Sequence, residues 1–181
     1  NDFFIADEVV IRILEMDKIN PPLDIEIGKG VHISSGVHLE RGVKIRAGSL
    51  LNGNIHLGVG TVVQENVSLS TYPNQQMTIG KNCVIMRGDL IKGNITIGDN
   101  TSIESSVIIT GSSEYPTIIG KNVVIKGTTY IFGSIIEDDL FIEHSVLKCK
   151  RVERTVRKDG TIQPVRWVMP QPQGLDIVRD L

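Results

Sequence analysis

The feature that most constrains this chain is an aliphatic residue that returns at every sixth position along most of its length. The repeat is interrupted by an insertion around residues 72–74, by a second insertion at residues 112–116, and by the loss of one residue near its end. Self-similarity at a fixed short period is typical of solenoids, in which each repeat packs only on its neighbours. Nineteen positions belong to the repeat: Ile27, Ile33, Leu39, Ile45, Leu51, Leu57, Val63, Leu69, Ile79, Ile85, Ile91, Ile97, Ile103, Ile109, Ile119, Ile125, Ile131, Ile136 and Ile142.

Two observations exclude a helical interpretation of the repeat. Apolar residues do not recur at the three- and four-residue spacing of an amphipathic helix. Glycines also interrupt the pattern too often for a helix, because glycine destabilises helix interiors. They follow the aliphatic residue at Gly28, Gly58, Gly80, Gly98 and Gly120. We expect them at tight corners, since glycine adopts backbone angles that are closed to other residues.

The repeat resembles the isoleucine-patch hexapeptide family. The resemblance implies an all-β fold, a left-handed parallel β-helix of triangular section with about 18 residues in each coil. Nineteen hexads then make about six coils. We expect residues 23–147 to form the solenoid and residues 1–22 to form an N-terminal cap, as helix or strand. Residues 148–181 are expected to pack on the solenoid as a hairpin and tail.

The C-terminal segment contains a hairpin signal. Asp159-Gly160 is a two-residue turn pair favoured in β-hairpins, and it lies between two stretches that can form strands. The last residues, LDIVRDL at 175–181, are expected to form a short helix against the solenoid.

Composition argues against several classes of partner. A formal net charge of −2 gives no electrostatic case for nucleic acid or for an anionic membrane surface. No run reaches the ~18 apolar residues of a membrane-spanning helix. The first residues, NDFFIADEVV, lack the pattern of a secretory signal. We therefore expect a cytoplasmic protein, in which Cys83 and Cys149 are reduced thiols.

The period also places residues on the surface. Both insertions are expected to leave the same corner of the solenoid, two coils apart, and such loops often carry binding residues. One outward column is expected to be apolar, and a column of this length is unlike a solvent-exposed surface. It comprises Leu50, Leu90, Ile108, Tyr130 and Leu147. Because relatives with this repeat are commonly trimers, we expect a homotrimer.

The central part of the chain carries a more specific resemblance. RGD at 87–89 is followed by IGDNTSIESSVI and then by YPTIIGKNVVIKGTTYIFGSIIEDD. These segments resemble the γ-class carbonic anhydrases. The resemblance places the three zinc histidines of that family on Thr110, Gly127 and Phe132, none of which binds zinc as histidine does. It therefore implies a relative without zinc and without carbonic anhydrase activity.

The same resemblance implies a ligand pocket between subunits. The glutamine that holds the reacting species in the family falls on Glu104, and the Arg87–Asp89 pair is expected to clamp a subunit boundary. The predicted pocket consists of Arg87, Asp89, Glu104, Thr110, Gly127 and Phe132.

The histidines bear on two classes of function, of which the first named below is our main interpretation and the second the alternative. His38 and His56 are 18 residues apart, so we expect them to stack outward, on the face that also carries the lost zinc site. One hypothesis is a non-catalytic binding or assembly protein with an inter-subunit pocket. The other is an acyltransferase that uses acetyl-CoA or another acyl-CoA. That enzyme needs a histidine general base, for which His38, His56 and His144 are the candidates.

Overall fold

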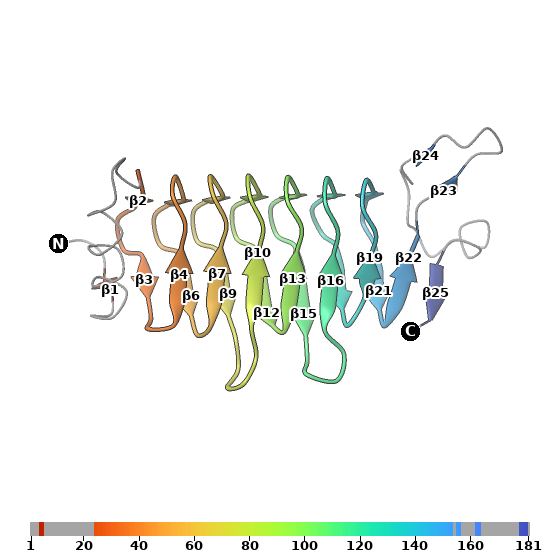
Figure 1. Cartoon of the computed structure of the whole chain (residues 1–181), viewed down its shortest axis with the longest axis horizontal. Helices are drawn as coiled ribbons and strands as arrows, with labels where there is room; N and C mark the ends of the chain where they lie inside the picture. Colours follow the sequence, from red (N-terminus) through yellow and green to blue (C-terminus); the bar gives the residue numbers. More distant parts are fainter. Residues whose placement is uncertain (1–3, 6–23, 154, 157–161, 164–177, 181) are drawn as a thin grey trace.

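A computed structural model describes residues 4–5, 24–153, 155–156, 162–163 and 178–180. Within these ranges the chain is a left-handed parallel β-helix, as predicted, with strands stacked along one axis (Figure 1). Three parallel sheets form its sides, and we call them sheets A, B and C. The described residues include no helix able to cross a membrane.

The sheets are built from short strands in the following order. Sheet A contains β1 (Phe4–Ile5), β3 (His32–Ile33), β6 (Leu50–Asn52), β9 (Ser68–Ser70), β12 (Leu90–Gly93), β15 (Ile108–Gly111), β18 (Tyr130–Phe132) and β21 (Val146–Lys148). Sheet B contains β2 (Glu26–Ile27), β5 (Lys44–Ile45), β8 (Val62–Val63), β11 (Val84–Ile85), β14 (Ser102–Ile103), β17 (Val124–Ile125) and β20 (Phe141–Ile142). Sheet C contains β4 (Val37–Leu39), β7 (Ile55–Leu57), β10 (Met77–Ile79), β13 (Ile95–Ile97), β16 (Thr117–Ile119), β19 (Ile135–Ile136), β22 (Lys150–Val152) and β25 (Val178–Asp180).

Each coil takes one strand from sheet B, one from sheet A and one from sheet C, in that order. The described residues form about seven coils, from β2 to β22, rather than the predicted six. The count from the sequence stopped at Ile142, because the last two strands are spaced at five residues instead of six. Their core residues, Leu147 and Val152, are 4% and 0% exposed. The solenoid therefore continues beyond residue 147 to Val152.

The period-six residues form the core, as predicted. Eighteen of the nineteen are buried, and Ile27 in the first coil is partly buried. They stack in register from coil to coil: Ile91 pairs with Ile109, and Ile109 pairs with Ile131. Parallel in-register pairing therefore repeats the same apolar contact along the whole axis and leaves alternate residues pointing outward.

The glycines after the aliphatic residues have a different role from the one predicted. Gly58, Gly98 and Gly120 do not adopt positive φ. Instead they lie close to the next coil, where a Cβ atom on Gly98 would come within 2.7 Å of the Gly120 carbonyl carbon. The positive φ angle belongs to the residue two positions later, for example Asn100 at 58°. Glycine is thus required here by the spacing between coils rather than by its own backbone angles.

The ends of the solenoid are covered by added strands. β1 pairs in parallel with β3 at the N-terminal end. At the other end β25 pairs antiparallel with β22, so the short helix predicted within 175–181 is wrong for the described residues 178–180. An unpaired strand edge offers backbone donors and acceptors that a strand satisfies and a helix does not. β23 (Thr155–Val156) and β24 (Ile162–Gln163) form the predicted hairpin. Residues 1–3, 6–23 and the Asp159-Gly160 turn lie outside the described residues.

Two neighbouring isoleucines on β16 allow the contribution of core burial to stability to be measured. Ile119 is 1% exposed and Ile118 is 40% exposed, on opposite faces of one strand. We expect Ile119→Ala to lower the free energy of unfolding by about 2–5 kcal/mol, because it leaves a cavity between coils. Ile118→Ala is the matched control and should change it by less than about 1 kcal/mol. Urea unfolding followed by circular dichroism measures both, and equal losses would contradict the burial pattern.

Candidate functional site

The two insertions leave the same corner of the solenoid, as predicted. They connect β9 to β10 and β15 to β16, and Figure 1 shows both loops projecting from the same edge, between sheets A and C. The loops touch, since the Gln75 Nε2 atom lies 3.4 Å from the Ser113 Oγ atom. The Lys92 ammonium, on β12 in the next coil, lies 4.5 Å from the centre of the Tyr72 ring in the first loop. Two of the six predicted pocket residues, Thr110 and Phe132, lie at this corner.

Thr110 and Phe132 are neighbours in register on β15 and β18. The Thr110 hydroxyl lies 3.5 Å from the Tyr130 hydroxyl, and the Phe132 ring centre lies 6.3 Å from that of Tyr115. Gly127, the third position to which the resemblance assigned a zinc histidine, lies at the opposite corner, where the chain enters sheet A. Neither the residue types nor their arrangement in one chain suits zinc, and no group of three or more His, Cys, Asp or Glu side chains suited to a metal is found among the described residues.

The other four predicted pocket residues lie at the corner between sheets B and A. Arg87 and Asp89 follow β11, Glu104 follows β14, and Gly127 follows β17. Within one chain the six predicted residues therefore form two groups rather than a single pocket. One group lies where the strands of sheet A begin, and the other lies where they end. Arg87 is exposed, with its Nη2 atom 3.7 Å from the Glu65 carboxylate.

His38 and His56 stack on each other, as predicted. Their ring centres are 4.9 Å apart and the rings are inclined by 22°. The His56 Nε2 atom lies 2.9 Å from the Glu40 Oε1 atom, and Glu40 also accepts a hydrogen bond from the Val59 N–H group. The prediction that the two histidines share a face with Thr110 and Phe132 is wrong. Both histidines lie on sheet C, whereas Thr110 and Phe132 lie on sheet A. The stacked pair occupies the first two coils and is separate from every predicted pocket residue.

His144 lies at the corner that holds most of the predicted residues. We define the B–A corner as residues 86–89, 104–107, 126–129 and 143–145, which connect sheet B to sheet A in the last four coils. It contains Arg87, Asp89, Glu104, Gly127 and His144, five of the nine candidate residues. At its centre, Lys126 forms an ion pair with Glu104. The B–A corner is therefore our candidate functional site.

Both ring nitrogens of His144 lie near a polar side chain. Its Nδ1 atom lies 2.7 Å from the Thr128 hydroxyl of the preceding coil, a hydrogen-bond distance. Its Nε2 atom lies 3.6 Å from the Glu143 Oε1 atom, where the carboxylate acts through charge rather than through a hydrogen bond. The imidazole is 55% exposed and Glu143 is 20% exposed. A hydroxyl, an imidazole and a carboxylate in this order form an arrangement suited to proton transfer.

The B–A corner also holds a buried carboxyl group. Asp89 is 1% exposed, and its Oδ1 atom accepts a hydrogen bond of 2.8 Å from the Val107 N–H group. Its Oδ2 atom is buried without a partner. In an earlier coil Ser49 occupies this position, accepting from Val67 N–H and donating to the Gln64 carbonyl. Burial raises the pKa of Asp89 from 3.8 to about 8, against hydrogen bonds from backbone N–H groups that lower it.

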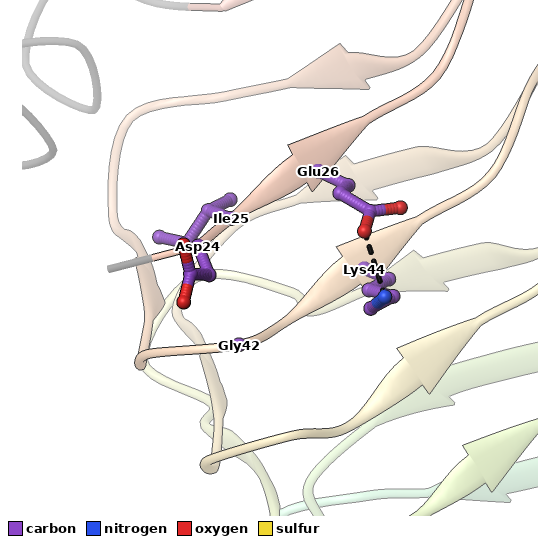
Figure 2. A pocket seen from close by; sticks show the side chains of 5 residues that line it. All are labelled: Asp24, Ile25, Glu26, Gly42 and Lys44. Carbon is purple, nitrogen blue, oxygen red and sulfur yellow. Dashed lines mark ion pairs between the residues drawn. The ribbon is translucent and has the colours of Figure 1, made fainter. Parts of the chain in front are cut away.

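A pocket lies away from this corner, at the N-terminal end of the solenoid. It is lined by Asp24, Ile25, Glu26, Gly42 and Lys44 among the described residues (Figure 2). The Glu26 carboxylate is 2.7 Å from Lys44 Nζ and 3.0 Å from Arg46 Nη1, and the hydrogen bond from Lys44 contributes most to lowering the pKa of Glu26. These charges pair with one another, and no histidine lines the pocket, so it does not compete with the B–A corner as a site for chemistry.

The apolar column predicted on one face lies on sheet A. Leu50, Leu90 and Ile108 are 41%, 38% and 40% exposed, and Tyr130 continues the column. The last member is wrong, because Leu147 points into the core and the 68% exposed Val146 takes its place. Loss of one residue before β21 shifted the register, and a shift of one residue moves a side chain to the opposite face.

Two residues of the candidate site were missed from the sequence, Thr128 and Glu143. A signal was present for Thr128, because earlier coils have Gly48, Asn66 and Gly88 at the same corner position. A β-branched residue at a position that favours glycine or asparagine is unusual and marks a site of interest. Glu143 gave no such signal, since its role depends only on its distance from His144.

Comparison with known proteins supports the fold. No family model matches the sequence, and no curated protein matches it. Among solved structures, LpxA from Acinetobacter baumannii is similar with a TM-score of 0.54 and 17% identity, over 84% of this chain and 68% of that chain. A UDP-N-acetylglucosamine acyltransferase gives a TM-score of 0.49 and 22% identity, over 81% of this chain and 71% of that chain. A mutant of perosamine N-acetyltransferase from Caulobacter crescentus, in complex with CoA and GDP-perosamine, gives a TM-score of 0.23 and 16% identity, over 66% of this chain and 47% of that chain.

At these identities the likeness concerns the fold. The fold shared with these structures is the left-handed β-helix, and the likeness does not single out the carbonic anhydrases to which the central motifs were compared. The second and third of these structures carry the names of an acyltransferase and an acetyltransferase.

Asp89 makes the stability of the protein depend on pH. The folded protein retains a proton on Asp89 up to about pH 8, whereas the unfolded chain releases it near 3.8. The contribution of Asp89 is therefore full below pH 3.8 and is lost as pH rises toward 8. Relative to Asp89→Asn, the wild type should lose about 1.4 kcal/mol of unfolding free energy per pH unit in this window. Urea unfolding at several pH values measures the difference, and parallel pH profiles for the two proteins would contradict a neutral Asp89.

Proposed function

We propose that this protein is an acyl-CoA-dependent acyltransferase in which His144 is the general base. The observation that carries the proposal is the imidazole of His144 held between the Thr128 hydroxyl, at 2.7 Å, and the Glu143 carboxylate, at 3.6 Å. The names of the structurally similar proteins support acyl transfer as the reaction class. At their level of identity they support no particular acceptor.

The reaction transfers an acyl group from the thioester of an acyl-CoA to a hydroxyl or amine acceptor. His144 removes the proton of the attacking group, a bond forms between that group and the thioester carbon, and the carbon–sulfur bond breaks. The same imidazole returns the proton to the CoA thiolate. The Glu143 carboxylate lies 3.6 Å from the Nε2 atom, on the side of the ring away from the Nδ1 contact.

The other two candidate histidines are less suited to this role. His56 directs one nitrogen to Glu40, and its ring is stacked on that of His38. Both rings lie on the first two strands of sheet C, apart from the corner that gathers Arg87, Asp89, Glu104 and Gly127. His56→Ala is therefore a suitable control for His144→Ala.

We also propose that the protein acts as a homotrimer, with the apolar column on sheet A at the subunit boundary. The B–A corner borders sheet A, so a neighbouring subunit on that face would enclose the exposed side of His144. Such enclosure would remove water from the site and strengthen its electrostatic interactions. The proposed use of an acyl-CoA is consistent with the cytoplasmic location that the sequence suggests.

The alternative function is binding or assembly without catalysis. The loss of all three zinc-ligand histidines at Thr110, Gly127 and Phe132 favours it. In that case the trimer and its pocket would remain, but no acyl group would be transferred. The two functions therefore differ in turnover and not in oligomeric state.

Turnover of acetyl-CoA tests the catalytic role. We expect the wild type to bind acetyl-CoA saturably in a calorimetric titration and to release CoA in the presence of amino-sugar or alcohol acceptors. His144→Ala should retain binding but release CoA at least about 100-fold more slowly, because a general base contributes that factor or more. CoA is best measured by chromatography rather than with a thiol reagent, since Cys149 is a free cysteine that is only partly buried.

His56→Ala should match the wild type in both binding and turnover. If the wild type binds no acetyl-CoA, the acyltransferase proposal fails and the assembly function is favoured. If His144→Ala turns over at the wild-type rate while His56→Ala is inactive, the general base is on sheet C and not at the B–A corner.

Charge placed on sheet A should break the oligomer. We expect the Ile108→Glu, Tyr130→Glu double variant to have the mass of a monomer and the wild type that of a trimer, by light scattering, because buried unpaired carboxylates oppose association. Ile118→Glu is the matched control on sheet C, since Ile118 and Ile108 are equally exposed at 40%. A double variant with unchanged mass would show that sheet A is not the boundary.

A further inference from the structure

Positive φ angles at the corners of the solenoid are distributed unevenly. Among the described residues, eleven residues other than glycine adopt positive φ, and seven of them are asparagine or aspartate. These two types tolerate the left-handed region best after glycine, because their short polar side chains form local hydrogen bonds. The other four are Ser106, Thr128, His144 and Cys149. Three of these four occupy the B–A corner in three successive coils.

The conformation of Thr128 is the most demanding of the three. Its φ angle is 61°, and a β-branched side chain in this region is strained. The equivalent position in the preceding coils accepts glycine or asparagine, as at Gly48, Asn66 and Gly88. The fold itself therefore does not require threonine here. Strained residues that persist in a well-formed structure are often found where chemistry depends on their position.

The contact between His144 and Thr128 offers a path for a proton. When His144 acts as a base its Nδ1 atom is unprotonated, and the hydrogen bond of 2.7 Å between Nδ1 and Thr128 is then donated by the threonine hydroxyl. The Glu143 Oε1 atom lies 3.6 Å from the other ring nitrogen, Nε2. The imidazole is thus aligned to remove a proton from Thr128 itself.

We propose that Thr128 is a nucleophile that carries the acyl group as an ester before it reaches the final acceptor. This inference rests on the proposed acyltransferase function and adds a covalent intermediate to it. Thr128 is exposed, so a thioester can reach its hydroxyl. A nucleophile hydrogen-bonded to a base that a third group orients is the general pattern of covalent catalysis by hydroxyl side chains.

The acyl group moves to the acceptor in two steps. In the first, the Thr128 Oγ1 atom attacks the thioester carbonyl, its proton passes to His144 Nδ1, and the carbon–sulfur bond breaks. The proton then moves to the departing CoA thiolate. In the second, His144 removes the proton of the acceptor hydroxyl, amine or water, which attacks the threonyl ester. The ester bond breaks, and the proton returns to Thr128.

Trapping the ester tests the inference. The full-length protein is incubated with p-nitrophenyl acetate or with acetyl-CoA, quenched in acid, and examined by intact-mass and peptide mass spectrometry. We expect one acetyl group per chain on Thr128, removable by hydroxylamine as esters are. Thr128→Ser should retain the label, and His144→Ala should slow its formation at least about 100-fold.

Thr128→Asn separates a chemical role from a structural one. Asparagine suits the φ angle of 61° better than threonine does, so the variant should be at least as thermally stable as the wild type and yet form no ester. Asn66→Gly changes the equivalent corner position in an earlier coil, outside the candidate site, and should leave labelling unchanged.

Two outcomes would overturn the inference. One is an acetyl group on another residue, such as Lys126, with none on Thr128. The other is CoA release by Thr128→Asn at the wild-type rate, with both substrates bound at once. In either case the acyltransferase function stands and only the covalent step fails. A wild type that neither binds nor turns over acetyl-CoA contradicts the function itself.

Discussion

The stacking of each coil on the next is the interaction on which the rest of this structure depends. Short strands pair in parallel and in register, as Ile91 with Ile109 and Leu90 with Ile108 show. No strand is long enough to be stable alone, because strands of two to four residues satisfy few backbone groups. Stability comes from repeating one apolar contact and one ladder of hydrogen bonds along the axis. Any residue that alters the spacing between coils therefore affects the fold more than its size suggests.

The corners follow from this stacking and divide into two kinds. Where coils approach closely, as at Gly98 and Gly120, a side chain would collide with the next backbone. Where the chain reverses, the φ angle is positive and asparagine replaces glycine without difficulty, as at Asn100 and Asn122. Against this regular background the B–A corner is exceptional, because its last three coils place serine, threonine and histidine at the reversing position. The fold makes such a departure visible, since the same position recurs in each coil.

Chemistry on this scaffold depends on side chains at particular coils and not on the coil itself. The resemblance to carbonic anhydrases assigned zinc histidines to Thr110, Gly127 and Phe132, and in one chain these positions are divided between the two corners that border sheet A. The buried Asp89 lies at the same corner as Gly127, and burial raises its pKa to about 8. It is thus suited to stabilising the corner rather than to carrying negative charge. The imidazole of His144, with Thr128 and Glu143, is the part of this region that is suited to proton transfer.

The sequence by itself determined the solenoid, its core residues and the common corner of its two insertions. It could do so because the six-residue period can be recognised within each short stretch of sequence, without knowledge of contacts between distant residues. It also determined that His38 and His56 stack, since residues one coil apart share a face. Only the tertiary structure decided the seventh coil and the exposure of Val146 in place of Leu147, because single-residue losses shift the register there. It alone brought Thr128, His144 and Glu143 together, because a hydrogen bond between coils depends on the distance between atoms, which no period in the sequence records.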